Sequence, residues 1–193
     1  MAKLIQSFMN NQKFTAGGSF PTIMIKTVNN GEVDLGKPQN GKDWKMVVVY
    51  RGKHCPMCTN YLKQLEHLKD RFSDLGVDII AVSADPQSKS SVHIQEMKLT
   101  FPVAYDLSIE QMETLGLYIS HPRSAQETDR PFAEPGLYII NEKNQVHITS
   151  VSNAPFARPE LRVLLGSLGF VRNSNYPVRG TMSNTVENSA LYK

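Results

Sequence analysis

The sequence contains only two cysteines, Cys55 and Cys58, and they stand three positions apart. Such a close pair cannot cross-link distant parts of a fold, which argues against a secreted protein held together by disulfides. A zinc site is disfavoured as well, because zinc needs four ligands and only His54 is a nearby histidine. The pair is therefore interpreted as redox-active, with two buried structural thiols as the alternative.

The sequence also lacks long apolar runs and any concentration of charge. No run approaches the roughly 18 to 20 apolar residues of a membrane helix, and residues 1–14 lack the apolar core and cleavage site of a signal peptide. We therefore expect a cytoplasmic protein without a membrane partner. The net charge of +3 is spread without a basic, aromatic stripe, so nucleic acid is not an expected partner. No metal or other cofactor is indicated.

Length and composition predict one globular domain. With 193 residues, of which 40% are hydrophobic and 20% charged, the chain is long enough to bury a single core. We expect a lead-in at residues 1–19, a domain at residues 20–171 and a tail at residues 172–193. The tail is polar and without periodicity, and we expect residues 176–178 to anchor it on the domain or on a second subunit.

The chain is organised around a strand, a short loop and a helix. Residues 47–50 are β-branched and aromatic, which predicts a buried strand. Cys55 and Cys58 then open a helix, with Pro56 at its first position and Gly76 placed to end it. Apolar residues recur in this helix at steps of three and four: Leu62, Leu65, Leu68, Phe72 and Leu75.

The position of the pair favours thiolate chemistry. A helix N-terminus stabilises an anion by about 0.3 to 1 kcal/mol, and by up to ~2 kcal/mol when partly buried. Arg51 and Lys53 add positive charge on the same approach, with His54 as a further candidate. We therefore expect one thiol to fall from a pKa of about 8.5 to roughly 6 to 7. Dipole and exposure arguments favour Cys55, near the N-cap, as an exposed acidic thiol, with Cys58 one turn deeper.

The remaining sequence predicts alternating strands and helices. Asn30 and Gly31 mark a hairpin turn, and the strand, helix, strand order around the cysteines predicts a parallel crossover. Asp85 and Pro86 mark the N-cap and first position of the next helix. Loop 120–134 is long and polar, so we expect it to form a mobile border of the active site. Expected strands span residues 22–28, 32–35, 77–82, 101–105, 136–141 and 145–151, and expected helices span residues 85–97, 108–116 and 159–168.

These segments resemble a known family. The motif YRGKHCPMC, the strand DIIAV and the segment PFAEPGLYII are similar to the peroxiredoxin-like branch of the alkyl hydroperoxide reductase and thiol-specific antioxidant family. The resemblance covers roughly residues 20–171. It implies an α/β, thioredoxin-like fold with a central mixed β-sheet flanked by helices and an N-terminal β-hairpin. It also implies a possible homodimer, and it matches Pro135 to the proline that thioredoxin-fold proteins hold cis opposite the active cysteines.

Three helper residues of that family are replaced in this chain. Relatives place a proline, a threonine and an arginine around the attacking cysteine, which corresponds to Cys58. Those three places hold Arg51, Cys55 and Glu134 here. Arg51 or Arg130 is the candidate to supply the missing charge. The cysteine at the threonine position restores the C-x-x-C of thioredoxins, in which the first cysteine attacks.

Three functions remain open at this point. In a thiol-dependent peroxidase, one thiolate attacks a hydroperoxide and forms a sulfenic acid, and the neighbouring thiol condenses with it to a disulfide. Thioredoxin or another thiol would then reduce that disulfide. The resemblance favours this function with Cys58 attacking, whereas the intact C-x-x-C and Pro135 favour a protein disulfide reductase with Cys55 attacking. A redox sensor without enzymatic turnover is the third alternative.

Overall fold

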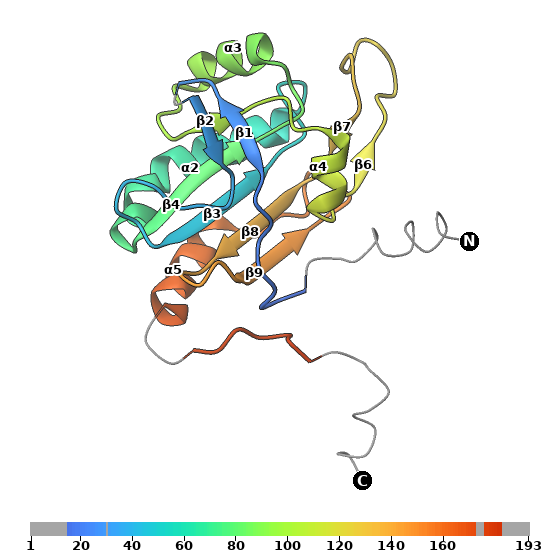
Figure 1. Ribbon diagram of the computed structural model, residues 1–193. Helices are drawn as coiled ribbons and strands as arrows, with labels where there is room; N and C mark the ends of the chain where they lie inside the picture. Colours follow the sequence, from blue (N-terminus) through green and yellow to red (C-terminus); the bar gives the residue numbers. More distant parts are fainter. Residues whose placement is uncertain (1–14, 30, 173–175, 183–193) are drawn as a thin grey trace, which may run out of the picture.

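A mixed sheet of seven strands forms the centre of the molecule (Figure 1). The computed structural model describes residues 15–29, 31–172 and 176–182. The strands are β1 (Met24–Thr27), β2 (Gly31–Asp34), β3 (Trp44–Val49), β4 (Val77–Val82), β5 (Val103–Ala104), β6 (Ile119–Ser120), β7 (Phe132–Ala133), β8 (Gly136–Ile140) and β9 (Val146–Val151). The helices are α2 (Pro56–Asp74), α3 (Gln87–Met97), α4 (Ile109–Thr114) and α5 (Leu161–Val171).

The sheet has the order β2-β1-β5-β4-β3-β8-β9, with β6 and β7 paired separately. Strands β3, β4 and β5 run parallel, and the flanking pairs are antiparallel. Helices α2 and α3 make the crossovers between the parallel strands. The predicted mixed sheet, its N-terminal hairpin and its flanking helices are therefore confirmed.

Both faces of the sheet are covered, which explains the nearly continuous apolar runs of β3 and β4. Val48 belongs to the core beneath α2, α3 and α5, while its neighbour Val47 belongs to the core beneath α4. Successive residues of a strand point to opposite faces, so a strand between two cores is apolar at nearly every position. The cysteine helix α2 packs its apolar stripe on the first of these cores.

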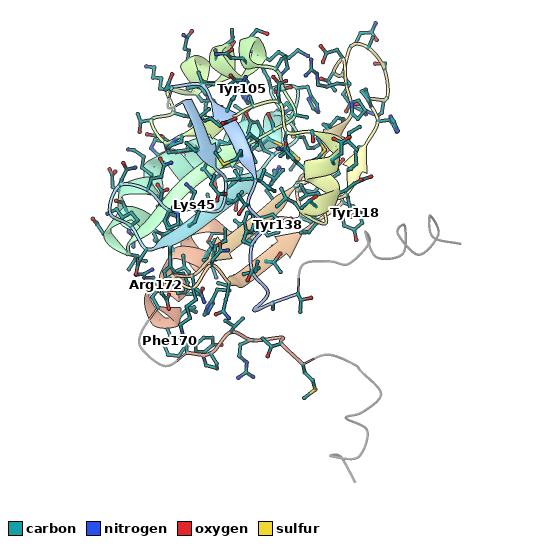
Figure 2. All side chains as sticks on the ribbon, in the orientation of Figure 1. Lys45, Tyr105, Tyr118, Tyr138, Phe170 and Arg172 are labelled. Atoms are coloured by element: carbon teal, nitrogen blue, oxygen red, sulfur yellow. The ribbon has the colours of Figure 1, made fainter. Side chains whose placement is uncertain are left out.

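One ion pair interrupts this apolar centre. Lys45 of β3 lies directly opposite Asp78 of β4, and Lys45 Nζ is 2.6 Å from Asp78 Oδ2. Both side chains are buried, and Lys45 is visible inside the sheet in Figure 2. Asp78 Oδ2 also accepts a hydrogen bond from the backbone N–H of Gln39. A buried charge of this kind requires its partner, because removing one side leaves the other uncompensated.

Several element boundaries differ from the expectations by a few residues, among them those of α5, which spans Leu161–Val171 instead of 159–168. Strand β3 begins at Trp44, earlier than residues 47–50, because residues 44–46 pair with β4 as well. Pro86 is the N-cap of α3, not its first helical residue, because the Asp85 carboxylate accepts the N–H of Lys53 instead of capping the helix. Loop 120–134 is closed at its base, where β6 and β7 pair.

The described part of the tail lies near the end of α5. The ring of Tyr176 contacts that of Phe170, with 5.2 Å between the centroids, and Phe170 and Arg172 mark this end of the molecule in Figure 2. Residues 176–178 line a pocket with Trp44 and Arg172, so they contact the domain as expected. Of the helices described, none has the length and apolar character to cross a membrane.

Candidate active site

The loop between β3 and α2, residues 50–55, is called the cysteine loop, and Asp85 holds it in place. Gly52 has φ +131°, and a Cβ at this position would lie 2.8 Å from Asp85 Oδ2. Glycine is therefore required here both by its backbone conformation and by the close approach of the carboxylate. The N–H of Lys53 donates to the same carboxylate at 2.6 Å, and the N–H of Cys55 donates to the Gly52 carbonyl at 3.2 Å. These bonds fix where helix α2 begins.

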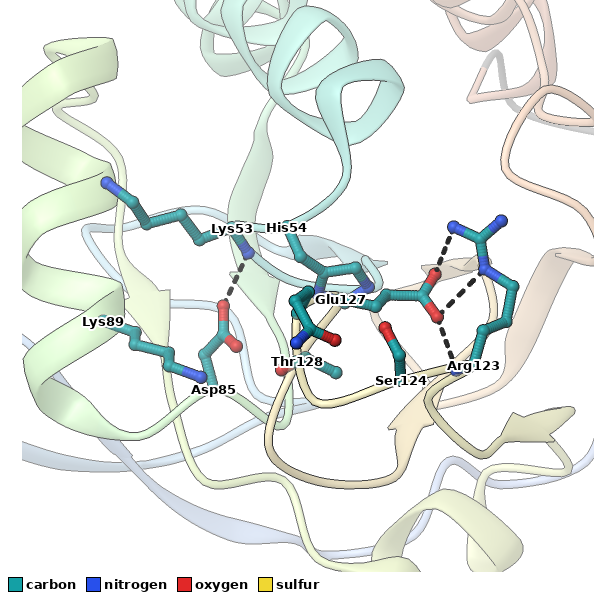
Figure 3. A pocket seen from close by; sticks show the side chains of 9 residues that line it. Lys53, His54, Asp85, Lys89, Arg123, Ser124, Glu127 and Thr128 are labelled. Carbon is teal, nitrogen blue, oxygen red and sulfur yellow. Dashed lines mark hydrogen bonds and ion pairs between the residues drawn. The ribbon is translucent and has the colours of Figure 1, made fainter.

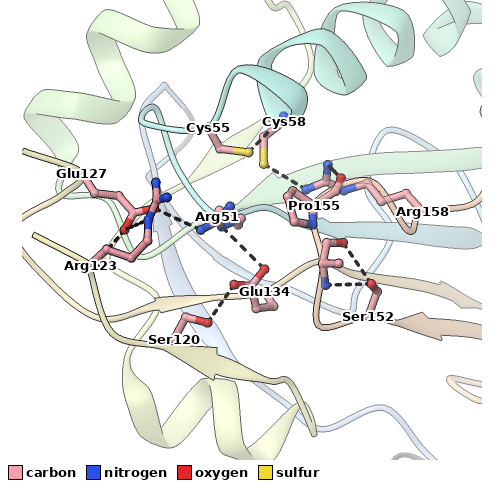
Figure 4. Close-up of polar contacts among 11 residues, drawn as sticks. Arg51, Cys55, Cys58, Ser120, Arg123, Glu127, Glu134, Ser152, Pro155 and Arg158 are labelled. Carbon is pink, nitrogen blue, oxygen red and sulfur yellow. Dashed lines mark hydrogen bonds and ion pairs between the residues drawn. The ribbon is translucent and has the colours of Figure 1, made fainter.

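The two cysteines lie on the first turn of α2 and are both reduced (Figure 4). Cys55 is the N-cap residue, Pro56 is the first helical residue, and Gly76 follows the helix with φ +73°, all as predicted. The backbone N–H of Cys58 donates to Cys55 Sγ at 3.4 Å. Cys55 is 3% exposed and Cys58 is 0% exposed. The expectation of an exposed Cys55 is therefore wrong, because Cys55 packs into the apolar core that α2 covers.

The surroundings separate the acidities of the two thiols. A hydrogen bond from the Cys58 thiol lowers the pKa of Cys55 to about 6 against the opposing effect of burial, aided by the Cys58 N–H, Arg51 and Arg158. The pKa of Cys58 is raised, first because its thiol donates to Cys55 and then because it is buried. At neutral pH the pair therefore holds one proton, on Cys58, and one thiolate, on Cys55.

Arg158 is a site residue that sequence reasoning missed. Its Nη2 donates to Cys58 Sγ at 2.9 Å, and its Nη1 donates to the Pro155 carbonyl at 2.7 Å. The guanidinium also lies 5.2 Å from the ring centre of Tyr61 on α2, whose hydroxyl donates to the Pro159 carbonyl. Arg158 comes from the segment between β9 and α5, about a hundred positions from the cysteines. No local spacing in the sequence signals such a contact.

Arg51 lies on the other side of the pair and is held by two carboxylates. Its Nη2 is 3.3 Å from Glu127 Oε1, and its Nε is 3.5 Å from Glu134 Oε2. The guanidinium also lies 4.6 Å from the ring centre of Phe132. Glu134 is further held by a hydrogen bond from Ser120 at 2.7 Å. Glu134, where relatives have an arginine, thus serves here to hold Arg51 near Cys55.

The other predicted supporting residues lie at different distances from the chemistry. His54 packs on Phe132, with 4.7 Å between the ring centroids, and its pKa is lowered mainly by burial. Arg130 contacts Asp106, Asp129 and the Ala84 carbonyl, and none of these contacts reaches the cysteines. Among the described residues no peptide bond is cis, so the cis proline implied for Pro135 is absent. The trans form is the intrinsically favoured isomer of an X–Pro bond.

Pro135 nevertheless lies on the cysteine side of the sheet. It precedes β8, which pairs with β3, and its carbonyl accepts the N–H of Ser152. Pro135 and Arg158 line the same small cavity, together with Tyr61 of the cysteine helix. The structure therefore brings together Cys55, Cys58, Arg51, His54 and Pro135, joined by Arg158, while Arg130 stands apart.

Comparison with known proteins agrees with this arrangement. A profile of the family described as Redoxin matches residues 15–163, which is more than half of the chain. The chain belongs to the Redoxin family. The matched residues of this redoxin include both cysteines, Arg51 and Arg158.

The curated relatives of this redoxin carry the name thiol-disulfide oxidoreductase ResA. The protein from Bacillus thuringiensis is 25% identical over 111 residues, covering 57% of this chain and 62% of the relative. The protein from Halalkalibacterium halodurans is 22% identical over 140 residues, covering 72% of this chain and 70% of the relative. The matched part of this redoxin thus spans about 62% of the length of the first of these relatives.

Solved structures of peroxiredoxins share the fold. A peroxiredoxin-like protein from Aquifex aeolicus matches with a TM-score of 0.69 and 16% identity over 83% of this chain and 89% of its own. A mutant peroxiredoxin 6 of Arenicola marina matches with a TM-score of 0.68 and 19% identity over 81% of this chain and 72% of its own. AhpC of Mycobacterium bovis matches with a TM-score of 0.66 and 17% identity over 87% and 98%. The predicted thioredoxin-like, peroxiredoxin-type fold is therefore confirmed.

Proposed function

We propose that this redoxin reduces hydroperoxides, with Cys55 as the attacking thiolate and Cys58 as the resolving thiol. The observation that carries the assignment is the pair of hydrogen bonds from Cys58 to Cys55, one from the backbone N–H and one from the thiol. Both bonds stabilise the anion on Cys55, and the thiolate is the reactive form of cysteine. This reverses the order of attack that alignment with peroxiredoxins suggested.

The chemistry then proceeds in two balanced steps. The Cys55 thiolate attacks the terminal oxygen of the hydroperoxide, the O–O bond breaks, and an alkoxide or hydroxide leaves and takes up a proton. Cys55 is now a sulfenic acid. Cys58 loses its proton and attacks the Cys55 sulfur, so a disulfide forms and the hydroxyl leaves as water. An external thiol reductant must return two electrons before the next cycle.

The two arginines support different steps of this cycle. Arg51 lowers the pKa of Cys55 and so supports the attacking thiolate. Arg158 donates to the sulfur of Cys58, which must become a thiolate before it can attack the sulfenic acid. Arg158 also lowers the pKa of Cys55, so both cations favour the attacking thiolate and Arg158 acts again when Cys58 carries charge.

Access to the pair favours a small substrate. The sulfurs belong to side chains that are 3% and 0% exposed. The terminal oxygen of a hydroperoxide is narrow enough to approach a sulfur in such a recess, whereas a disulfide on a folded protein brings bulky surroundings with it. Burial thus favours a hydroperoxide over a protein disulfide as the substrate. The close pair of cysteines fits a reducing compartment such as the cytoplasm.

Single cysteine variants test this assignment. We expect Cys58→Ser to react with hydrogen peroxide in one rapid turnover and stop at a sulfenic acid that dimedone traps. Cys55→Ser should react no faster than free cysteine, and free cysteine is measured alongside it as the control. Stopped-flow peroxide consumption and mass spectrometry measure both. A wild-type rate in Cys55→Ser would contradict Cys55 as the attacker, and slow reaction of the wild-type protein itself would overturn the peroxidase function.

A second candidate function is reduction of protein disulfides. It is favoured by the acidic Cys55 at the helix N-cap with Cys58 one turn later, the arrangement suited to thiol-disulfide exchange. The relatives named thiol-disulfide oxidoreductase support the same candidate function. Turnover with insulin disulfide that exceeds turnover with hydroperoxide would favour this candidate. A homodimer stays a prediction in either case.

A further inference from the structure

A pocket beside the cysteine loop has no role in the steps described above. Its volume is about 800 Å³, and it lies between loop residues Lys53 and His54, the start of α3, and residues 123–128 (Figure 3). Sites for drug-sized ligands measure roughly 300 to 1,000 Å³. Hydrogen peroxide would fill only a small part of this space, so the pocket suits a larger molecule.

The lining of the pocket describes the chemistry of its occupant. All of its lining side chains are polar or charged, and three of them are the cations Lys53, Lys89 and Arg123. No Leu, Ile, Val, Met or Phe side chain lines the pocket, so its apolar surface comes from the hydrocarbon stems of these polar side chains. Glu127, whose pKa is lowered to about 2 by hydrogen bonds with Arg123, adds a fixed negative charge on the same wall. The pocket therefore fits a molecule with carboxylates and an amino group.

The lysines are held only by exposed partners. Lys53 pairs with Glu96 and Lys89 pairs with Asp129, and both carboxylates are more than half exposed. Exposed ion pairs contribute about 0 to 1 kcal/mol, so a ligand carboxylate can replace the protein partner at little cost. Neither Glu96 nor Asp129 lines the pocket, which leaves the lysines as the charges that a ligand meets.

His54 joins the pocket to the reactive sulfur. It lines the pocket and directly precedes Cys55 in the chain. Its ring packs on Phe132, and both ring nitrogens are buried without a hydrogen-bond partner among the described residues. A ligand in this pocket therefore lies beside the residue that precedes Cys55.

We propose that this pocket binds a small peptide thiol, with carboxylates and an amino group, which reduces the Cys55–Cys58 disulfide. The proposal rests on the function proposed above and names the reductant of the same site. The peptide thiolate attacks Cys55 Sγ, the Cys55–Cys58 bond breaks, and Cys58 leaves as a thiolate beside the Arg158 guanidinium. A second thiolate attacks the peptide sulfur and releases a peptide disulfide, so two thiols are oxidised and one protein disulfide is reduced.

Glutathione and its diethyl ester provide matched probes, because the ester keeps the thiol and amino group but loses both carboxylate charges. The full chain is first oxidised with diamide, so the assay does not depend on peroxide. Reduction is followed by rapid acid quenching, alkylation of the protein thiols and mass spectrometry of the protein, because the exchange leaves the total number of free thiols unchanged. We expect glutathione to reduce the wild-type disulfide at least about fivefold faster than the ester does, with saturation. Dithiothreitol shows that the disulfide of every variant is intact and reducible.

The variant Lys53→Gln with Lys89→Gln tests the pocket itself. We expect its ratio of glutathione rate to ester rate to fall about fivefold, with smaller falls for each single variant. Lys143→Gln, in the turn between β8 and β9, removes a charge away from the pocket and should keep the wild-type ratio. Equal rates for the two probes in wild type, or an unchanged ratio in the double variant, would overturn the proposal. Failure of the peroxidase function would show separately, as slow oxidation of the reduced protein by peroxide.

Discussion

Two chemically identical residues of this redoxin are made different by their neighbours. Cys55 accepts hydrogen bonds from the backbone N–H and the thiol of Cys58. Cys58 keeps its proton, and its sulfur accepts a hydrogen bond from Arg158. The pKa of Cys55 falls and the pKa of Cys58 rises for the same reason, since one proton is shared unequally. The proposed order of attack therefore rests on the hydrogen bonds in the first turn of α2.

The pH dependence of thiol alkylation tests this sharing. Since only the thiolate reacts, the rate for Cys55 in the wild-type protein should rise with pH, with a midpoint at about 6, and level off above it. Cys58→Ala removes the thiol donor and should raise the midpoint by about one unit or more. Cys58→Ser keeps a hydroxyl donor and should shift it less. An unchanged midpoint in Cys58→Ala, measured with iodoacetamide, would contradict the role of the Cys58 thiol.

Arg158 provides a second test at the same scale. Arg158→Met removes the donor to Cys58 Sγ, so the resolving thiolate loses its stabilising charge. We expect the sulfenic acid on Cys55 to persist about tenfold longer, since a hydrogen bond to a charged group contributes about 1.5 to 3 kcal/mol. Arg158→Lys should restore part of the rate. Arg162→Met, on the exposed side of α5, is the control, and equal sulfenic acid lifetimes in both methionine variants would refute the assignment.

At the scale of elements, loop 120–134 connects the cysteine loop to α3. Glu127 holds Arg51, and Asp129 holds Lys89 of α3. Glu134 at its end also holds Arg51. The loop was expected to be a mobile border of the site, and the structure places it there, tied down by side-chain ion pairs more than by backbone hydrogen bonds. Its position therefore depends on charge.

Hydrogen exchange measures this dependence. Within residues 121–131, the amides with a hydrogen-bond acceptor in the described structure are those of Arg123 and Glu127. We therefore expect the loop to exchange much faster than β4, whose amides lie in a paired strand. High salt weakens exposed ion pairs, so it should speed exchange in the loop further and leave β4 unchanged. Loop exchange as slow as that of β4 would contradict the expected mobility.

At the scale of the whole molecule, the two ends of β3 serve different purposes. Its carboxyl end leads into the cysteine loop, while Trp44 at its start is covered by residues from the end of the chain. The Arg172 guanidinium lies 4.8 Å from the Trp44 ring centre and donates to Asp43 at 2.8 Å. Trp44 Nε1 donates to Glu142 at 2.7 Å. The C-terminal segment thus contributes to stability at a distance from the chemistry.

Truncation tests whether the C-terminal segment affects stability without affecting the reaction with peroxide. A chain that ends at Arg172 loses the contact of Tyr176 with Phe170 and the wall that residues 176–178 add to the pocket beside Trp44, while it keeps Arg172 over the Trp44 ring. We expect a loss of about 1 kcal/mol, which lowers the melting temperature by roughly 2 to 4 °C for a chain of this size. The rate of peroxide reaction should not change. A chain that ends at Met182 is the control, and equal melting temperatures for the two truncations would show that residues 176–182 do not stabilise the domain.

The sequence by itself determined the features that depend on residues close together in the chain. Buried strands, the helix with Cys55 at its N-cap, Pro56 at its start and Gly76 after its end follow from local backbone preferences and hydrophobic periodicity. The acidity of one thiol followed too, because the N-cap position and the C-x-x-C spacing place the Cys58 N–H near Cys55 Sγ. The thioredoxin-like fold was recognisable from these local segments in their order.

Only the tertiary structure decided which distant groups meet the sulfurs and how far water reaches them. Arg158 arrives from beyond β9, and Glu127 arrives from a loop whose path no local pattern specifies. The burial of Cys55, contrary to the expected exposure, arises because Cys55 packs in the same core as residues of β3, β4, α2 and α5. Such contacts depend on how separate elements pack, and packing is a property of the whole chain that neither propensity nor spacing encodes.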